Sequence, residues 1–294
     1  MDNSAGTLGV IGLGLIGGSA ALKLKEVGLV DRVLGHDSSE TNATRAFELG
    51  IIDQIVDLPE LLALSDVILV AIPVDKAVIL LPEILDALNN RQLVIDLGST
   101  KARLGYVVKK HANRSQYVAC HPIAGTEHSG PDAAHRTLFD DKVNIICDPD
   151  DSDELALRKT ELLMKGLGMR NKFMSSSEHD RHIAYVSHLS HISSFMLGKT
   201  VLEVEQDEKN IFDMAGSGFA STVRLAKSSP EMWAPIFAEN SENIVDVLSA
   251  YIGNLEEMKQ QIINQDKSAL KNTMREVNKI KPVLDGETIK IDKK

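Results

Sequence analysis

The sequence predicts an α/β fold in which a doubly wound sheet domain, residues 1–174, is followed by an all-helical domain, residues 175–294. Two observations predict the first domain: β-branched, apolar runs alternate with segments of helical periodicity, and a glycine-rich loop joins the first strand to the first helix. A third predicts the second domain, because strand signals nearly vanish after Met174. A chain of 294 residues is long enough for two domains.

Composition and charge exclude several classes of protein. The formal net charge is -10, whereas nucleic acid or an anionic membrane requires a basic face. No stretch is long and apolar enough to span a membrane, and the apolar stretch 8–22 differs from a signal peptide because glycines interrupt it. The two cysteines, Cys120 and Cys147, favour a reducing compartment, so we expect a cytoplasmic protein.

The glycine loop has the spacing GxGxxG at Gly12, Gly14 and Gly17. The first glycine permits a tight turn, the second lets the backbone approach a pyrophosphate, and the third lets helix and strand pack closely. Because strand, loop and helix follow in the required order, the pattern favours a Rossmann-like nucleotide site over a bare structural turn. We assign Leu15 and Ile16, at the phosphate-facing start of the helix, to the same cofactor site.

A carboxylate follows the second predicted strand. Asp37 lies twenty positions after Gly17 and precedes two serines rather than an arginine. A carboxylate there accepts hydrogen bonds from the ribose hydroxyls of NAD and repels the 2′-phosphate of NADP. The sequence therefore predicts NAD as the cofactor.

Further strand ends point to the same edge of the sheet. In a doubly wound sheet, ligands bind outside the carboxyl ends of the strands. We therefore expect the glycine loop and Asp37 to lie near three other segments, each of which follows a predicted strand. The three segments contain Ile72 with Pro73, Ser99, and His121. We assign Ile72 and Pro73 to the cofactor site. The sheet is expected to be mostly parallel, with antiparallel additions near its end.

His121 ends a short apolar strand and precedes a polar loop that runs to Gly130. An imidazole titrates near neutrality, which suits it to accept a proton from a substrate. A thiol mechanism through Cys120 is disfavoured, because adjacent residues of an extended strand point to opposite faces.

A long helix is expected to begin at Ser175, which forms a Ser-x-x-Glu capping pattern with Glu178. The histidines of this helix are His179, His182, His188 and His191. Imidazoles three residues apart can bind one metal ion together, but no carboxylate or cysteine lies beside these histidines at a spacing typical of zinc sites, so we expect no metal.

Two later segments complete the helical half. A glycine loop precedes a helix carrying Arg224, and Ser229-Pro230 begins a helix with Trp233 in its first turn. Arg224 is either a surface salt-bridge residue or a bidentate ligand for a substrate carboxylate. Residues 241–280 form an amphipathic helical hairpin, whose apolar stripe is either intramolecular core or a subunit interface.

Several motifs together resemble the prephenate and arogenate dehydrogenase family of tyrosine biosynthesis. The likeness extends from Leu8 to about Pro282, and the histidine loop is its most specific part. The motifs are GLGLIGGS from Gly12, DLGSTK from Asp96, HPIAGTEHSG from His121, SHLSH from Ser187 and TVRLAKSSPEMW from Thr222.

The resemblance implies NAD-dependent oxidative decarboxylation of prephenate to 4-hydroxyphenylpyruvate, in a homodimer formed through the helical domain. His121 matches the catalytic histidine that binds the ring hydroxyl, and Ser99 the serine that bridges this hydroxyl and the nicotinamide. Arg224 matches the arginine that binds a substrate carboxylate. The remaining substrate-binding residues are expected to be His191, Thr126, His188 and Trp233.

The sequence leaves alternatives open for the substrate and for the class of protein. Ala220 stands where some members of the family carry a lysine, which leaves the choice between prephenate and arogenate open. A 3-hydroxyacid dehydrogenase would use a lysine on the helix after the junction, where Lys199 is the only lysine. A non-catalytic NAD-binding protein would need no reactive histidine.

Overall fold

The computed structural model describes residues 6–207 and 211–285, and the chain divides into two compact units. The first unit is Met1–Ile244 and the second is Val245–Lys294. The first unit contains the sheet and the helices that follow it directly, so the predicted sites all belong to this unit.

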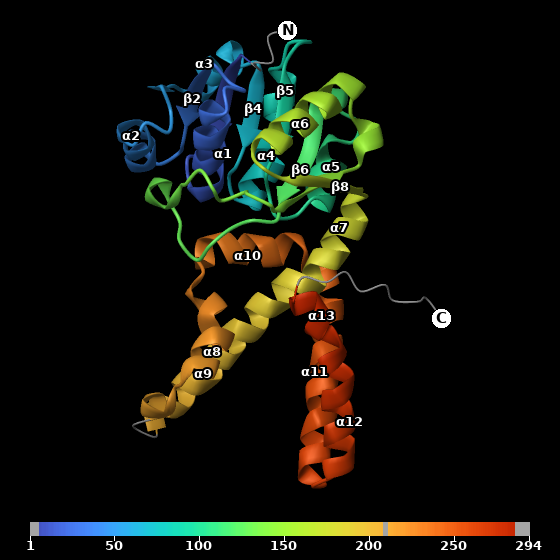
Figure 1. Ribbon diagram of the computed structural model, residues 1–294. Helices are drawn as coiled ribbons and strands as arrows, with labels where there is room; N and C mark the ends of the chain where they lie inside the picture. The colour runs from blue at the N-terminus through green and yellow to red at the C-terminus, as the bar shows by residue number, and fades with distance from the viewer. Residues whose placement is uncertain (1–5, 208–210, 286–294) are drawn as a thin grey trace. The chain divides into compact units, whose positions relative to one another are not determined.

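One eight-stranded sheet forms the centre of the first unit, in the order β3-β2-β1-β4-β5-β6-β7-β8 (Figure 1). Strands β1 to β6 pair in parallel, β7 is antiparallel to β6, and β8 is parallel to β7. The predicted fold class is confirmed, including the late antiparallel addition. The strands are β1 Thr7–Ile11, β2 Arg32–His36, β3 Gln54–Ile55, β4 Val67–Val70, β5 Leu93–Asp96, β6 Tyr117–Pro122, β7 Val143–Cys147 and β8 Arg170–Met174.

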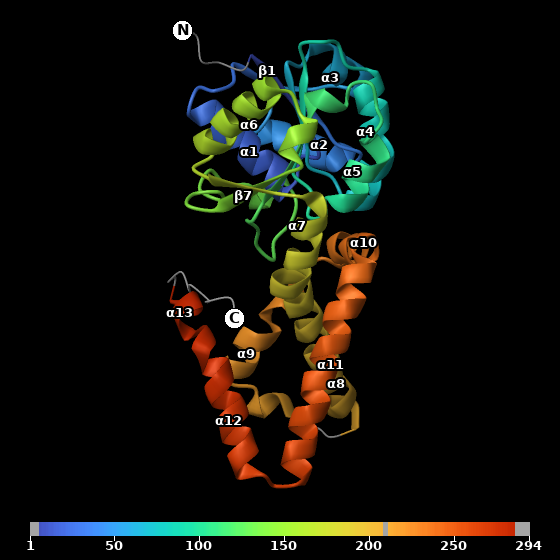
Figure 2. The same ribbon diagram turned by 90° about the vertical axis from the view of Figure 1, so that its right-hand side faces the viewer.

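Helices cover both faces of this sheet, as Figure 2 shows. Helices α1 and α6 share one apolar core with the strands, and α3, α4 and α5 share a second core on the other face. Strands covered on both faces lose their polar alternation, which explains the continuous apolar runs of β4 and β5. The helices are α1 Leu15–Glu26, α2 Glu40–Glu48, α3 Leu58–Leu64, α4 Val74–Asp86, α5 Ala102–Val108 and α6 Glu154–Gly166.

The helical part of the first unit begins where the sequence predicts. The Ser175 hydroxyl accepts a hydrogen bond from the Glu178 N–H, and Ser229 caps α10 in the same way. The long helix is not uniformly α-helical, because a π-helical turn at Ala184–His188 separates its two parts. The helices are α7 Ser176–Ile183, α8 Leu189–Asp207, α9 Ser217–Val223 and α10 Pro230–Glu239.

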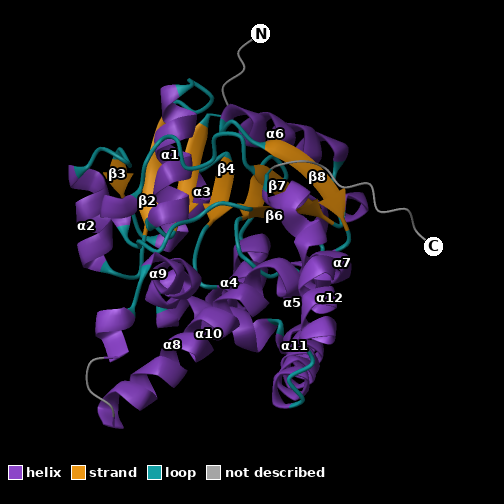
Figure 3. Cartoon of the chain, turned by 60° about the horizontal axis from the view of Figure 1, so that its bottom comes forward, coloured by secondary structure: helices purple, strands orange, loops and turns teal. Residues whose placement is uncertain are grey.

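The second unit contains the predicted helical hairpin (Figure 3). Helix α11 Ser241–Ile263 begins in the first unit, and α12 Lys267–Val277 is capped by Asp266, whose carboxylate accepts from the next helical N–H groups. A short helix, α13 Lys281–Leu284, follows. Within residues 6–207 and 211–285, no helix has the length and hydropathy required to cross a membrane.

Candidate active site

The glycine loop follows β1 and leaves its own backbone open on one side. A side chain at Gly12, whose φ is +94°, would lie 2.4 Å from the Ala71 carbonyl oxygen, and one at Gly17 would lie 2.0 Å from the Gly12 carbonyl oxygen. By contrast, a side chain at Gly14 would meet no described protein atom within 4 Å. The loop is therefore packed where it turns and open where α1 begins with Leu15 and Ile16, which fits a bound pyrophosphate.

Asp37 is held directly beside this loop. Its Oδ2 accepts a hydrogen bond from the Leu13 N–H at 2.8 Å, and its Oδ1 accepts one from the Ser39 N–H at 2.9 Å. A carboxylate oxygen has a second lone pair, so both oxygens can still accept from the hydroxyls of a ribose. The residues present therefore fit a dinucleotide.

The sheet topology brings the other predicted segments to the same edge. Strands β2, β1, β4, β5 and β6 are parallel neighbours, so Asp37, the glycine loop, Ile72 with Pro73, Ser99 and His121 all lie at or just beyond their carboxyl ends. The strand order changes direction between β1 and β4, which is where ligands bind in doubly wound sheets. The predicted convergence is present in the fold, and the roles of these residues stay predictions.

A buried polar network holds the loop that carries Ser99. The Lys101 ammonium group forms an ion pair with Asp96 and donates to the Cys120 carbonyl oxygen at 2.6 Å. The Tyr117 hydroxyl donates to the other Asp96 oxygen at 2.6 Å. Because Lys101 and Asp96 are buried, their charges are tolerated only as a hydrogen-bonded pair, which ties this loop to β5 and β6.

His121 lies in β6 and is 9% exposed. Its Nδ1 atom is 2.8 Å from Nε2 of His179, and Nδ1 of His179 is 2.7 Å from Oδ1 of Asp180. Burial, reinforced by the neighbouring His179, Lys101 and His188, holds the pKa of His121 well below its ordinary value. His121 is therefore neutral at physiological pH and able to accept a proton.

Asp180 is not among the residues predicted from the sequence, and His179 was considered there only as a possible metal ligand. Asp180 accepts hydrogen bonds from the backbone N–H groups of Lys101 and Ala102, each at 2.8 Å, although 78 or more positions separate them in sequence. A signal was available: His179 and Asp180 precede the apolar Ile183 by four and three positions, so all three share a helix face. By contrast, His182 is exposed, so it does not share the surroundings of His179.

A cluster of rings lies beside this edge. The His191 ring stacks on the Trp233 ring with centroids 3.5 Å apart, and the His188 ring meets the Trp233 ring edge to face at 6.0 Å. Trp233 packs against Val74, the first residue of α4, which directly follows Pro73. Among the described residues, the buried Nε1 of Trp233 has no hydrogen-bond partner and is available as a donor. Burial lowers the pKa of His188 to about 4.

Arg224 reaches the loop that follows His121, but as an exposed ion pair. Its Nη1 atom is 3.6 Å from Oε2 of Glu127, and the Arg224 side chain is 55% exposed. Arg224 begins a 3-10 turn, Arg224–Lys227, rather than lying within an α-helix as expected. Thr126 is exposed in the same loop, where its hydroxyl accepts from the His128 N–H at 3.2 Å.

Two alternative chemistries fit the structure poorly. Cys120 is buried in the apolar core beneath α1 and α6, and burial raises the pKa of its thiol to about 12, so it is not a nucleophile. Lys199 is exposed on α8 and lies 3.7 Å from Glu203, as a surface ion pair. Lys199 is therefore not the buried acid or base that a 3-hydroxyacid dehydrogenase would need.

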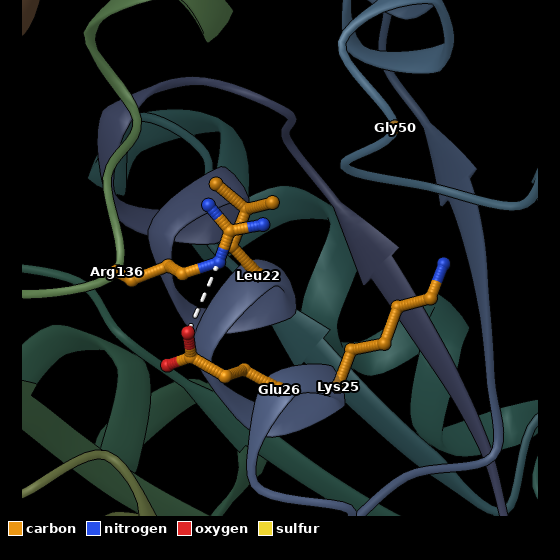
Figure 4. Close-up of a pocket in the computed structure, with 5 residues that line it drawn as sticks. All are labelled: Leu22, Lys25, Glu26, Gly50 and Arg136. Atoms are coloured by element: carbon orange, nitrogen blue, oxygen red, sulfur yellow. Dashed lines mark ion pairs between the residues drawn. The ribbon is translucent and has the colours of Figure 1, made fainter.

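A pocket of about 380 Å³ lies elsewhere, at the carboxyl-terminal half of α1 (Figure 4). Its cationic groups are already paired, because Arg136 lies 3.4 Å from Glu26 and Lys25 forms an ion pair with Asp53. The glycine loop adjoins the opposite end of α1, so this pocket is not the nucleotide site.

The fold and the site together define a dinucleotide-dependent dehydrogenase, an oxidoreductase. Residues 20–172 match the family model described as prephenate dehydrogenase, nucleotide-binding domain, and residues 175–276 match prephenate dehydrogenase, dimerization domain. The chain belongs to the prephenate dehydrogenase family of tyrosine biosynthesis, as its motifs predicted. The predicted cofactor, NAD, agrees with the nucleotide-binding domain.

Individual relatives agree with this assignment. The chain is 30% identical to a prephenate dehydrogenase of Bacillus subtilis, over 97% of this chain and 77% of the relative. It is 29% identical to a cyclohexadienyl dehydrogenase of Zymomonas mobilis, over 94% of this chain and 95% of the relative. The structure resembles that of Aquifex aeolicus prephenate dehydrogenase in complex with hydroxyphenyl propionate and NAD+, with a TM-score of 0.87, 29% identity, and coverage of 94% of this chain and 97% of the other.

Two glycine substitutions separate packing of the loop from contact with the cofactor. Gly17→Ala places a methyl group against the Gly12 carbonyl oxygen, so we expect a lower melting temperature together with loss of NAD binding. Gly14→Ala has space within the protein, so we expect an unchanged melting temperature and an NAD affinity at least about tenfold weaker. Calorimetric titration measures the NAD affinity of each variant, and thermal unfolding measures its melting temperature. Unchanged NAD affinity in Gly14→Ala would place the pyrophosphate elsewhere.

Proposed function

We propose that this chain is an NAD-dependent prephenate dehydrogenase, which converts prephenate to 4-hydroxyphenylpyruvate and CO2. The observation that carries the proposal is the buried His121 at the same sheet edge as Ser99 and the glycine loop, where burial lowers the pKa of the imidazole. The Bacillus subtilis relative and the Aquifex aeolicus structure, whose bound hydroxyphenyl propionate is an aromatic acid, support the choice of substrate.

The chemistry requires a base beside the ring hydroxyl. His121 accepts the proton of the C4 hydroxyl, and Ser99 holds that hydroxyl in line with the cofactor site. Bound NAD would supply the acceptor for the hydride that leaves C4. The ring carboxylate is lost as CO2, and its bonding electrons make the ring aromatic. His121 then returns its proton to the phenolic oxygen, so the base is regenerated.

The remaining predicted residues bind and orient the substrate. Prephenate carries two carboxylates, and the planar guanidinium of Arg224 can hold one of them by two parallel hydrogen bonds. The Nε1 donor of Trp233, which has no partner among the described residues, offers a further polar contact beside His191 and His188. Thr126 lies in the loop that carries Glu127, the present partner of Arg224, at the edge of the same site.

Domain organisation and assembly are part of the proposal. We place the boundary at residues 174 and 175, between the two family matches, although α7 and α10 pack against α5 and α4 within one compact unit. A homodimer is supported by the match to a dimerization domain and by exposed apolar side chains on α11 and α12. These are Val245, Ile252, Leu255, Ile262, Ile263, Met274 and Val277. Cytoplasmic location remains a proposal from cysteine usage.

Initial rates with each substrate and cofactor test the function. We expect the highest rate of NADH formation with prephenate and NAD, and a rate at least about tenfold lower with NADP, because Asp37 repels a 2′-phosphate. Arogenate, which differs from prephenate by an amino group in place of the side-chain keto group, is the alternative substrate. A higher rate with arogenate would show that arogenate is the preferred substrate. If neither substrate gives NADH, the proposal is contradicted.

Replacement of Arg224 tests the substrate-binding role. We expect Arg224→Ala to raise KM for prephenate about tenfold or more with a smaller change in kcat, because a carboxylate contact is lost in both ground and transition states. Arg224→Lys should recover part of the lost substrate affinity, since lysine keeps the positive charge but not the planar pair of donors of the guanidinium. Lys199→Ala, at an exposed cation on α8, is the matched control. An unchanged KM in Arg224→Ala would assign Arg224 to the surface ion pair alone.

A further inference from the structure

Three buried polar side chains form a continuous chain that ends at the proposed base. We propose that Asp180 and His179 are positioning residues, which fix His121 as the tautomer protonated at Nδ1 and thereby leave Nε2 as the proton acceptor. The inference rests on the proposed function only for the role of His121 as a base. For two neutral rings, the tautomer follows from the hydrogen-bond geometry alone.

The first link is the carboxylate of Asp180. Backbone N–H groups donate to both of its oxygens, from Lys101 to Oδ1 and from Ala102 to Oδ2, each at 2.8 Å. A carboxylate whose two oxygens both accept from backbone N–H groups acts as an acceptor toward further donors as well. His179 approaches Oδ1 through its own Nδ1 at 2.7 Å, so Nδ1 of His179 must carry the hydrogen.

The second link is the contact between the two imidazoles. A neutral His179 that is protonated at Nδ1 presents an unprotonated Nε2, and this atom lies 2.8 Å from Nδ1 of His121. Two lone pairs at this distance would repel each other, so Nδ1 of His121 donates the hydrogen bond. A neutral His121 has one ring hydrogen, which leaves the lone pair on Nε2.

The surroundings prevent the chain from rearranging. His179 and Asp180 are buried, and the Asn240 side-chain amide donates to the Asp180 carbonyl oxygen at 2.7 Å. The reverse arrangement would direct a lone pair of His179 at the Asp180 carboxylate. When His121 receives the substrate proton at Nε2, its positive charge faces an acceptor that is itself hydrogen-bonded to a carboxylate, which stabilises the imidazolium.

The ring nitrogens report this arrangement directly. Long-range proton–nitrogen correlation spectra of the full chain, labelled with 15N-histidine and free of substrate and cofactor, distinguish protonated from unprotonated Nδ1 and Nε2. Spectra of His121→Asn and His179→Gln assign the two rings. We expect both rings to be protonated at Nδ1 and unprotonated at Nε2. A wild-type His121 protonated at Nε2 would overturn the proposal, whether or not the chain oxidises prephenate.

Kinetics of matched variants give the second readout. His179→Leu removes the acceptor, so we expect kcat for prephenate to fall about a hundredfold with KM nearly unchanged, because a misplaced base loses reactivity without loss of substrate contacts. His179→Gln keeps an acceptor oxygen on a side chain of similar reach and should recover most of kcat. His182→Leu, at the exposed histidine of the same helix, should match wild type.

The outcomes separate this inference from the proposed function. Equal kcat values for His179→Leu and wild type would overturn the positioning role, as would equal losses in the Leu and Gln variants with native melting temperatures. If wild type does not oxidise prephenate, the proposed function fails, and the spectra still decide the tautomer. If wild type is active and His121 is protonated at Nε2, the positioning role alone fails.

Discussion

The hydrogen bonds that Asp180 accepts from the backbone of Lys101 and Ala102 join the two parts of the active site. They fasten the first helix of the helical half to the loop after β5, at the edge where the parallel strands end. The same carboxylate orients His179, which contacts His121. One side chain thus links the loop that carries Ser99 to the strand that carries His121.

This linkage depends on a loop that cannot move freely. Lys101 contributes its backbone N–H to Asp180 and its ammonium group to Asp96, with Tyr117 as the second donor to Asp96. Removing one partner of a buried ion pair is costly, about 3–5 kcal/mol, because it leaves an uncompensated charge. The network therefore keeps the backbone in one conformation, and Ser99 lies within the segment that it holds.

The sequence predicted those features that depend on local order along the chain. The glycine loop and Asp37 follow from a strand, a turn and a helix within about forty residues, and His121 from a strand that ends in a polar loop. The family motifs were equally local. Pairings between distant segments were not predictable: His121 meets His179 across 58 positions, which only the packing of α7 against the sheet brings together.

Other differences have physical reasons of the same kind. The π-helical turn at Ala184–His188 adds a residue to one helical turn, which periodicity alone does not reveal. Whether Arg224 pairs with a surface carboxylate or a ligand depends on what its loop approaches, and the fold brings it to Glu127. Sequence pattern identified the elements and most candidate residues, whereas the contacts between residues far apart in sequence required the fold.

The central claim is that His121 is the base of an NAD-dependent oxidation. The most direct measurement is the steady-state rate of His121→Asn with prephenate and NAD, together with its NAD affinity and melting temperature. The account predicts a kcat lower by about a hundredfold or more, with KM for prephenate and NAD affinity close to wild type. A kcat close to wild type in the correctly folded variant would contradict it.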